Sequence, residues 1–352
     1  MRKMASIQTI QEITPIKGAD AIELSHVNGW AAVTKLGQFK VGQYVVFCEI
    51  DSWVPHSLAP FLSKEKEPRE YLNIKGERLR SVKLRGQLSQ GLILPFDVLP
   101  VGNYKEGDDV SEKLGIIKYE PPIPAQLSGQ VKGNFPSLVT KTDEERVQNI
   151  KGLDNQLDEV FVETEKLHGT SVSFVLNEKG ELEVCSRNLS LKEDENNLYW
   201  KLAKKNNAIA MLNSVKNFYE AEGVSVVTVA IQGEGVGQGV QKGWEYGIQV
   251  PKFFMFTIQV NGVKIKEDDY QIFKQMFEDS FQVKSVPEIC KSTLRKIVGE
   301  SKDVRKVLLK YVEGKSAIDG KTIREGSVFR SLTDSSFSFK VISNQFLLKG
   351  GE

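Results

Sequence analysis

Residues 161–174 read FVETEKLHGTSVSF, in which one lysine separates two segments of strand-like composition. Successive side chains of a strand point to opposite faces, so the even-numbered residues from Val160 to Lys166 share one face. Lys166 therefore ends the strand pointing as its apolar predecessors point, toward an interior or a cleft, where a charge needs a partner or a chemical purpose. Gly169 permits a sharp turn and a close approach of a ligand to the backbone. The stretch indicates either a solvated strand end or a nucleophilic lysine.

The composition indicates a globular protein with more than one domain. The chain has 352 residues, of which 40% are hydrophobic and 26% charged, and this length exceeds a comfortable single core. No apolar run reaches the roughly 20 residues that span a bilayer, and the N-terminus lacks the apolar core of a signal peptide. We therefore expect the cytoplasm or another reducing compartment and no membrane partner. The three cysteines form no CxxC, which predicts free thiols and neither a disulfide framework nor a zinc site.

Composition divides the chain into two domains joined by a connector. Residues 1–115 hold short alternating segments punctuated by glycine, which is typical of a small β-barrel. The segment YEPPIPAQLSGQVKGNFPS predicts a linker over residues 116–134, because its prolines do not continue regular structure. Residues 135–352 mix strands with helices, so the predicted fold class is α+β.

Helical patterns in the second domain occur in three places. One lies around residues 196–222 and another around 268–279. One or two more lie between residues 288 and 312, with Ser301 as a candidate N-cap.

Positive charge in the first domain concentrates in NIKGERLRSVKLRGQLSQGLILP. Strand parity puts Arg78 and Arg80 on one face but Lys83 and Arg85 on the other, so we expect a bend or bulge between the pairs. One interpretation is a strand edge guarded by charge against aggregation. The other is a groove that follows a phosphate backbone, because the net charge of +1 leaves such binding to local patches. The candidate residues for binding a nucleic-acid backbone are Lys75, Arg78, Arg80, Lys83 and Arg85.

Further polar residues stand at strand ends of the second domain. SRN presents Arg187 as a fork-shaped donor suited to phosphate or ribose oxygens. AIQGEGVGQGVQ puts Glu234 in a glycine-rich loop after a strand, and its spacing misses the dinucleotide fingerprint. IREGSVFR presents Glu325. In SSFSFKVIS an apolar face alternates with a polar face that includes Lys340.

Aromatic residues gather in KFFMFTI. Strand parity puts Phe254, Phe256 and Ile258 on one face. This face is either plain core or an aromatic wall against which a purine stacks.

In this order the segments resemble the motifs of the covalent nucleotidyltransferase superfamily, which contains ATP-dependent DNA ligases, RNA ligases and mRNA capping enzymes. EKLHGTS, EGVGQG and FPSLVTKTDEERVQNI are most similar to RNA ligases. The cation-rich segment and ITPIKGADAIELSHVNGW resemble an OB-fold of the tRNA-binding type. An OB-like module in front of the motifs resembles a family of RNA ligases with an N-terminal OB domain. The resemblance implies an N-terminal OB-like β-barrel and a C-terminal nucleotidyltransferase domain with antiparallel sheets and flanking helices.

The resemblance also implies an activity, which is ATP-dependent RNA ligation in RNA repair. It implies Lys166 as the nucleophile that forms lysyl-AMP, Lys340 as a second catalytic residue, and a Mg²⁺ or Mn²⁺ ion held by Glu234 and Glu325. The implied partner is RNA as a nicked or broken duplex, with no obligate protein partner. The implied nucleotide-binding residues are Thr164, Glu165, Leu167, Arg187, Glu234, Phe254, Phe256 and Lys340.

Two positions depart from the family pattern. The last motif is often K-x-K, but Ser338 stands where its first lysine is expected, so Arg330 or another cation must compensate. His168 replaces the more usual aspartate of the first motif, which removes one carboxylate near the metal. Two other interpretations remain: a DNA ligase or guanylyltransferase relative, and a noncatalytic RNA-binding protein with a ligase fold.

Overall fold

The computed structural model describes residues 2–122, 129–141 and 143–350. The chain divides into two compact units: an N-terminal unit of residues 1–122 with 347–352, and a C-terminal unit of residues 123–346. Both are rich in antiparallel sheet, and helices pack on the sheets of the C-terminal unit, so the predicted α+β class is confirmed. Among the described residues, no helix is long and apolar enough to cross a membrane.

The N-terminal unit is made of short strands. Antiparallel pairing gives the orders β1-β5-β11, β2-β3-β4, β10-β9 and β12-β6-β8-β7. The strands are β1 (Ala5–Thr9), β2 (Glu12–Pro15), β3 (Ile22–Val27), β4 (Trp30–Lys35), β5 (Tyr44–Cys48), β6 (Ser52–Pro55), β7 (Arg69–Tyr71), β8 (Ile74–Arg78), β9 (Val82–Leu84), β10 (Gln87–Ser89), β11 (Leu92–Pro95) and β12 (Ile117–Lys118).

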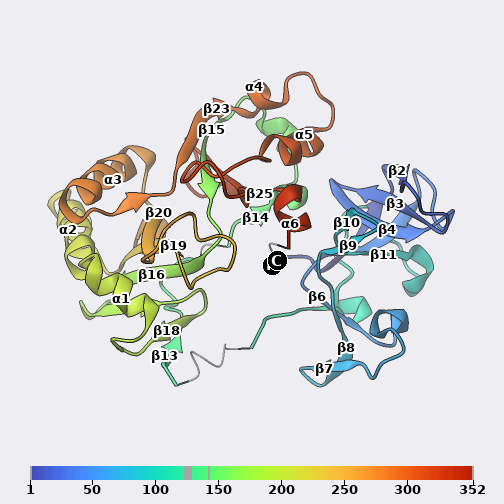
Figure 1. Ribbon diagram of the computed structural model, residues 1–352, viewed down its shortest axis with the longest axis horizontal. Helices are drawn as coiled ribbons and strands as arrows, with labels where there is room; N and C mark the ends of the chain where they lie inside the picture. The colour runs from blue at the N-terminus through green and yellow to red at the C-terminus, as the bar shows by residue number, and fades with distance from the viewer. Residues whose placement is uncertain (1, 123–128, 142, 351–352) are drawn as a thin grey trace. The chain divides into compact units, whose positions relative to one another are not determined.

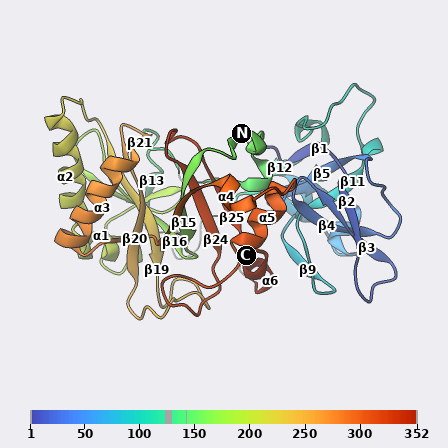
Figure 2. The ribbon, with the colours of Figure 1, turned by 90° about the horizontal axis from the view of Figure 1, so that it is seen from above.

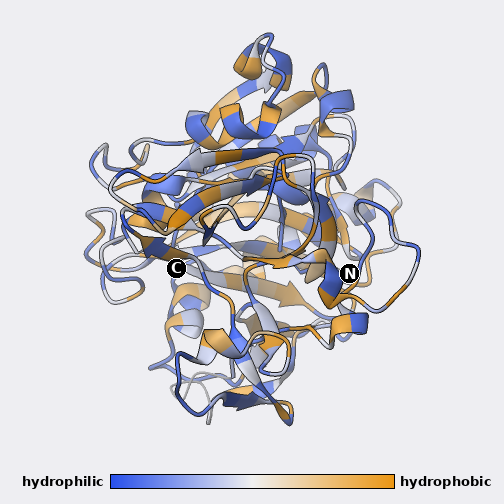
Figure 3. Cartoon of the chain, turned by 90° about the vertical axis from the view of Figure 1, so that its right-hand side faces the viewer, coloured by the Kyte–Doolittle hydropathy of each residue, from blue (hydrophilic) through white to orange (hydrophobic). Residues whose placement is uncertain are grey.

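Period-two alternation places the core of this unit. In β4, Trp30, Ala32 and Thr34 are buried while Ala31 and Val33 between them are half-buried. The Trp30 ring packs against Phe47 of β5, with ring centroids 5.8 Å apart. Hydrophobic and hydrophilic residues alternate along several strands in Figure 3. Because full burial of a large apolar side chain contributes about 1.5–3 kcal/mol, this alternation determines which face of each strand is internal.

Two short strands lie inside the segment 116–134 that was expected as a connector. Strand β12 pairs with β6 of the N-terminal unit, and β13 (Val131–Asn134) pairs with β18 (Leu189–Leu191) of the C-terminal unit. Residues 123–128 of the expected connector lie outside the described residues. Each end of the segment is thus fixed by pairing with a neighbouring sheet.

The larger sheet of the C-terminal unit has the order β13-β18-β17-β16-β19-β20-β21, with β22 beside β20. Helices α1 (Leu198–Lys205), α2 (Ala208–Ala221) and α3 (Glu267–Phe281) cover one of its faces (Figure 1), and α2 and α3 lie side by side there (Figure 2). The remaining strands are β16 (Thr170–Leu176), β17 (Leu182–Cys185), β19 (Val229–Val236), β20 (Lys252–Val260), β21 (Val263–Lys264) and β22 (Lys284–Ser285).

The second sheet of this unit has the order β14-β25-β24-β15-β23. Its apolar core includes Phe161, Phe329 and Phe339 and is completed by residues of α4 and α5. Its strands are β14 (Glu145–Arg146), β15 (Val160–Lys166), β23 (Glu288–Thr293), β24 (Gly326–Ser331) and β25 (Ser338–Ile342), and the helices are α4 (Leu294–Val298), α5 (Val304–Tyr311) and α6 (Asn344–Leu348).

The helix expected over residues 196–222 is two helices. Asn197 caps α1 by accepting a hydrogen bond from the backbone N–H of Tyr199 at 2.8 Å. Asn207, between α1 and α2, has a φ of 51°. Asparagine tolerates this left-handed conformation better than most residues, and it ends the helical path. The helix expected over 268–279 is confirmed as α3.

The expected N-cap at Ser301 is wrong. Helix α5 is capped by Asp303, whose carboxylate accepts a hydrogen bond from the backbone N–H of Lys306 at 3.0 Å. The Ser301 hydroxyl accepts instead from the backbone N–H of Asp303 at 3.3 Å. A cap depends on backbone geometry at the first turn, which a serine two residues away does not reach.

Candidate active site

Lys166 is the last residue of β15, where it pairs with Gly326 of β24. Its ammonium donates a hydrogen bond to Glu325 Oε1 at 2.7 Å, and its side chain is 28% exposed. Burial disfavours the charge, but Glu325 and Glu234 outweigh burial and hold the pKa of Lys166 above its ordinary value. The lysine is therefore paired and charged in this state, and a charge that neutralised the two carboxylates would make it easier to deprotonate.

Glu325 is held between Lys166 and His168. Burial by itself raises the pKa of Glu325, but Lys166 and His168 outweigh it, so that the pKa lies below its ordinary value. His168 Nδ1 lies 3.5 Å from Glu325 Oε2. The backbone N–H of His168 donates to the Tyr246 hydroxyl at 2.7 Å, and the imidazole packs edge-on against Trp244, with ring centroids 5.1 Å apart. These contacts fix the turn that follows the lysine.

Glu234 lies within β19, so the prediction that a glycine-rich loop carries it is wrong. Strand pairing continues through Gly235 and Val236, and the sheet positions the carboxylate. A Cβ on Gly169 would lie 2.2 Å from the Gly235 carbonyl oxygen, so glycine is needed where the turn meets β19. There the Gly169 N–H donates to Glu234 Oε1 at 3.1 Å. Burial raises the pKa of Glu234 to about 8, against the opposing effect of Lys166.

The donor set around Lys166 fits a divalent cation that shares its coordination with substrate. No group of three or more His, Cys, Asp or Glu side chains among the described residues forms a metal site by itself. Magnesium, however, usually keeps several waters and binds through one or two carboxylates plus substrate phosphates. Glu234 and Glu325 supply two such carboxylates. Glu325 Oε2 is buried and has no hydrogen bond of normal geometry among the described residues, so it has acceptor capacity left.

A carboxylate bridges two predicted nucleotide-binding cations. Asp143 Oδ1 lies 2.9 Å from Arg187 Nη2 and 3.1 Å from Lys340 Nζ. Burial raises the pKa of Asp143, but Lys340 and Arg187 outweigh it and hold that pKa below its ordinary value. Burial lowers the pKa of Lys340, and the nearby positive charges of Arg146 and Lys166 lower it further, whereas Asp143 raises it. Two cationic side chains from distant parts of the sequence thus meet at one carboxylate.

Ser338 lies two residues before Lys340 on β25, so the two side chains share a face. Lys264 of β21 brings its Nζ to 3.0 Å from Ser338 Oγ and 3.1 Å from Glu144 Oε1. The Ser338 hydroxyl donates to Glu144, and the Lys264 side chain is 14% exposed. A lysine from another sheet therefore lies at the serine position.

A β-bulge changes the aromatic strand β20. Opposite β19 the strand holds one extra residue, Phe256, and such an insertion reverses which side chains face the core. The prediction that Phe254, Phe256 and Ile258 share a face is therefore wrong. Ile258 lies in the apolar core, whereas Phe254 pairs with Glu234 and lies on the site's side of the sheet. The Phe256 carbonyl accepts a hydrogen bond from Arg330 at 3.0 Å, which uses one of the five N–H donors of that guanidinium.

The residues beside Lys166 are fixed by the surrounding chain. The Glu165 carboxylate accepts a hydrogen bond from the backbone N–H of Ala317 at 2.7 Å, and burial raises its pKa. Thr164 is half-buried and Leu167 is buried. Thr164 and Glu165, two of the predicted nucleotide-binding residues, lie in the strand that ends at Lys166, and Leu167, a third, begins the turn after it.

The sequence did not single out several residues that the fold brings to the site. Asp143, Glu144 and Arg146 lie in TKTDEERVQN, a segment noted for its resemblance and not for any single side chain. Lys264 has no sequence signal, because a lysine at a strand end is commonplace and its partner Ser338 is 74 residues away.

The five candidate RNA-binding cations differ in their surroundings. Strand β8 ends at Arg78, and β9 begins a separate hairpin at Val82, so the expected break between the pairs is confirmed. Lys75 pairs with Glu67 at 2.9 Å and Arg78 pairs with Asp51 at 2.5 Å. Within the described ranges, no ion pair is formed by Arg80, Lys83 or Arg85.

A half-buried lysine at a strand end, two carboxylates beside it, and cations from β25 and from the turn between β17 and β18 define a covalent nucleotidyltransferase. A family model of RNA ligases matches residues 159–342, and a model of an OB-fold domain matches residues 4–96. The chain belongs to the RNA ligase family, and it is an enzyme with an N-terminal OB-fold domain.

Solved structures of the Naegleria gruberi RNA ligase are similar to the whole chain. A mutant with AMP and Mn and another mutant with ATP and Mn are each 37% identical to it, with 99% of both chains covered and a TM-score of 0.82. The structure with PPi is 37% identical, with 100% of this chain and 99% of that chain covered and a TM-score of 0.80. A comparison with functionally curated proteins gives no match.

Proposed function

We propose that this RNA ligase joins an RNA 3′-hydroxyl end to a 5′-phosphate end, with ATP as co-substrate and lysyl-AMP on Lys166 as the first intermediate. The observation that carries the proposal is the convergence of Lys166 with Glu325 and Glu234, beside the cations Lys340 and Arg187. The similar Naegleria ligase structures, which hold ATP, AMP and Mn, support the choice of nucleotide and metal.

Lys166 attacks the α-phosphorus of ATP. A lysine with a pKa near 10.4 is almost fully protonated at neutral pH, and the two carboxylates here favour the protonated form further. The ammonium, on a side chain that is 28% exposed, first loses a proton to solvent; its nitrogen then forms a bond to phosphorus while the bond to the departing pyrophosphate breaks. A divalent cation, when bound by Glu234 and Glu325, supplies positive charge that favours loss of the proton and stabilises the phosphates. The products are lysyl-AMP and pyrophosphate.

The cations of the site hold the phosphates in line. Lys340 and Arg187 share Asp143 in the structure, and a phosphate bound in its place gains two charge-assisted hydrogen bonds. Lys264 supplies the charge that Ser338 lacks, because its ammonium lies at the serine hydroxyl. Phosphoryl transfer depends on positioning and electrostatics, so loss of any of these contacts should lower the reaction rate and have less effect on which substrate is used.

The two later steps use the same site. The RNA 5′-phosphate displaces Lys166 from the AMP phosphorus and forms adenylylated RNA. The 3′-hydroxyl then attacks the RNA 5′-phosphorus, releases AMP and leaves a phosphodiester. Arg80, Lys83 and Arg85, which form no ion pair with any described residue, bind RNA phosphates, and a nick or break in a duplex is the proposed substrate.

The test is the covalent label itself. With α-labelled ATP and Mn²⁺, wild-type protein should acquire label, and the Lys166→Ala variant should acquire none and fail to seal 5′-phosphate RNA. Supplied with pre-adenylated RNA, the same variant should seal at least partly, because that step bypasses the lysine. Labelled Lys166→Ala protein would refute the assignment, and loss of both reactions in a folded variant would refute the division of steps.

A further inference from the structure

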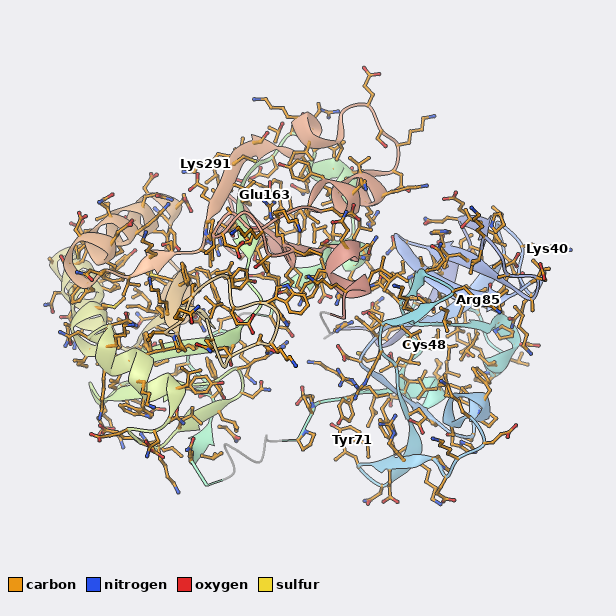
Figure 4. All side chains as sticks on the ribbon, viewed as in Figure 1. Lys40, Cys48, Tyr71, Arg85, Glu163 and Lys291 are labelled. Carbon is orange, nitrogen blue, oxygen red and sulfur yellow. The ribbon has the colours of Figure 1, made fainter. Side chains whose placement is uncertain are left out.

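A cluster of three aromatic rings lies in the N-terminal unit, far in sequence from the ligase motifs. Trp53 of β6, Tyr71 of β7 and Tyr119 after β12 come together because the sheet order β12-β6-β8-β7 sets their strands side by side. Their ring centroids are 5.3 Å apart for Trp53 and Tyr71, 5.8 Å for Trp53 and Tyr119, and 4.8 Å for Tyr71 and Tyr119. Figure 4 labels Tyr71 in this part of the unit. We call this cluster the aromatic pocket.

The aromatic pocket has a fixed floor and accessible walls. Trp53 is 2% exposed, and its indole N–H donates to the Ile74 carbonyl at 3.0 Å. Tyr71 and Tyr119 are half-buried, and they line a cavity of about 250 Å³. The guanidinium of Arg78 lies over the Tyr119 ring, 4.8 Å from its centroid. Flat faces of tyrosine and guanidinium thus border a space smaller than the roughly 300–1,000 Å³ of sites for drug-sized ligands.

The charges of the pocket do not suit a phosphate. Arg78 is already paired with Asp51 at 2.5 Å, and Arg69, at the pocket's edge, is paired with Glu77 at 2.5 Å. Two further carboxylates, those of Glu70 and Glu120, and the guanidinium of Arg80 line the same cavity. An anion that entered would meet carboxylates and two neutralised arginines, and among the lining residues that the structure describes only Arg80 would favour it.

The same groups do suit a nucleobase. Bases stack on tyrosine rings and on arginine guanidinium planes. Carboxylates accept hydrogen bonds from the exocyclic amines of cytosine and other bases. We propose that the aromatic pocket binds one unpaired base of the RNA substrate, while Lys83 and Arg85, which form no ion pair with the described residues, bind its phosphates. This inference rests on the proposed role of the N-terminal unit in holding RNA.

Base binding and phosphate binding are separated by two perturbations. Binding of a short single-stranded RNA is measured by fluorescence anisotropy, with EDTA present so that no chemistry occurs. A series of RNAs carries an abasic site at one position at a time. Wild-type protein should lose affinity at one position by about 5- to 150-fold, the value of one base stacked on an aromatic side chain.

The Tyr119→Leu variant removes the stacking face. It should bind intact and abasic RNA with equal affinity, and it should keep the wild-type dependence of affinity on salt. Tyr119→Phe keeps the ring and should retain the preference for the intact RNA, which controls for folding of the pocket. The double variant of Lys83 and Arg85 to alanine leaves the lining of the pocket intact, and it should give the opposite result, with a lower salt dependence and a retained loss at the abasic position.

Two outcomes overturn the proposal. Equal binding of all abasic RNAs by wild-type protein would show that no base is held, and a retained abasic effect in Tyr119→Leu would place the base elsewhere. Neither outcome would contradict the proposed ligase activity. That activity is tested separately, by labelling of Lys166 with α-labelled ATP in the same preparations and without RNA.

Discussion

Moving the lysine from position 264 to position 338 tests whether the position of a charge matters more than the strand that carries it. Lys264 Nζ lies 3.0 Å from Ser338 Oγ and 3.1 Å from Glu144 Oε1, with side-chain exposures of 14% for Lys264 and 18% for Glu144. Lys264→Ala removes the cation and leaves Glu144 without it. Ser338→Lys in the same chain returns an ammonium to the same place from β25.

The magnitude has two parts. Loss of one partner of a buried ion pair costs about 3–5 kcal/mol, and the partial exposure here places the loss of unfolding free energy near the lower figure, about 3 kcal/mol. A hydrogen bond to a charged group contributes about 1.5–3 kcal/mol, so loss of a phosphate contact should slow lysyl-AMP formation by about 10- to 150-fold. The double variant should recover most of both losses.

The assay is single-turnover labelling with α-labelled ATP, together with thermal unfolding of each variant. Lys284→Ala is a matched control, because that lysine lies on the same sheet but its side chain is 68% exposed; it should label at the wild-type rate. Wild-type labelling by a folded Lys264→Ala variant would refute the reasoning. So would a folded double variant that labels no faster than Lys264→Ala.

Three further outcomes are expected. Glu325→Ala and Glu234→Ala should each reduce lysine labelling severely, since metal-ion charge stabilisation is worth several kcal/mol. EDTA should abolish labelling of wild-type protein, and full labelling in EDTA would contradict the role of the metal. Asp143→Asn should move the high-pH limit of labelling to lower pH. Burial, Arg146 and Lys166 lower the pKa of Lys340 and Asp143 raises it, so without the carboxylate Lys340 should lose its proton at a lower pH. A pH–rate profile identical to that of wild type would contradict this. Replacing Arg80, Lys83 and Arg85 together by alanine should leave labelling intact, weaken nick sealing and reduce the salt slope of RNA binding by about one unit or slightly less per lost contact, whereas an unchanged slope would assign these cations to protection of a strand edge.

The sequence by itself determined the features that depend on local order along the chain. The alternation around KLHG placed Lys166 at a strand end, and SSFSFKVIS separated the apolar face of β25 from the polar face that carries Lys340. The order of the motifs indicated the family and the two domains. These features follow from periods of two residues and from motif spacing, which a single sequence displays directly.

The tertiary structure alone decided how distant residues meet. The extra residue Phe256 in β20 is visible only in its pairing with β19, and it reverses the face assigned to Ile258. Strand pairing also took Glu234 out of the expected loop, and the approach of β21 to β25 brought Lys264 to Ser338. Such contacts depend on register and on packing between segments far apart in the chain, which no local pattern specifies.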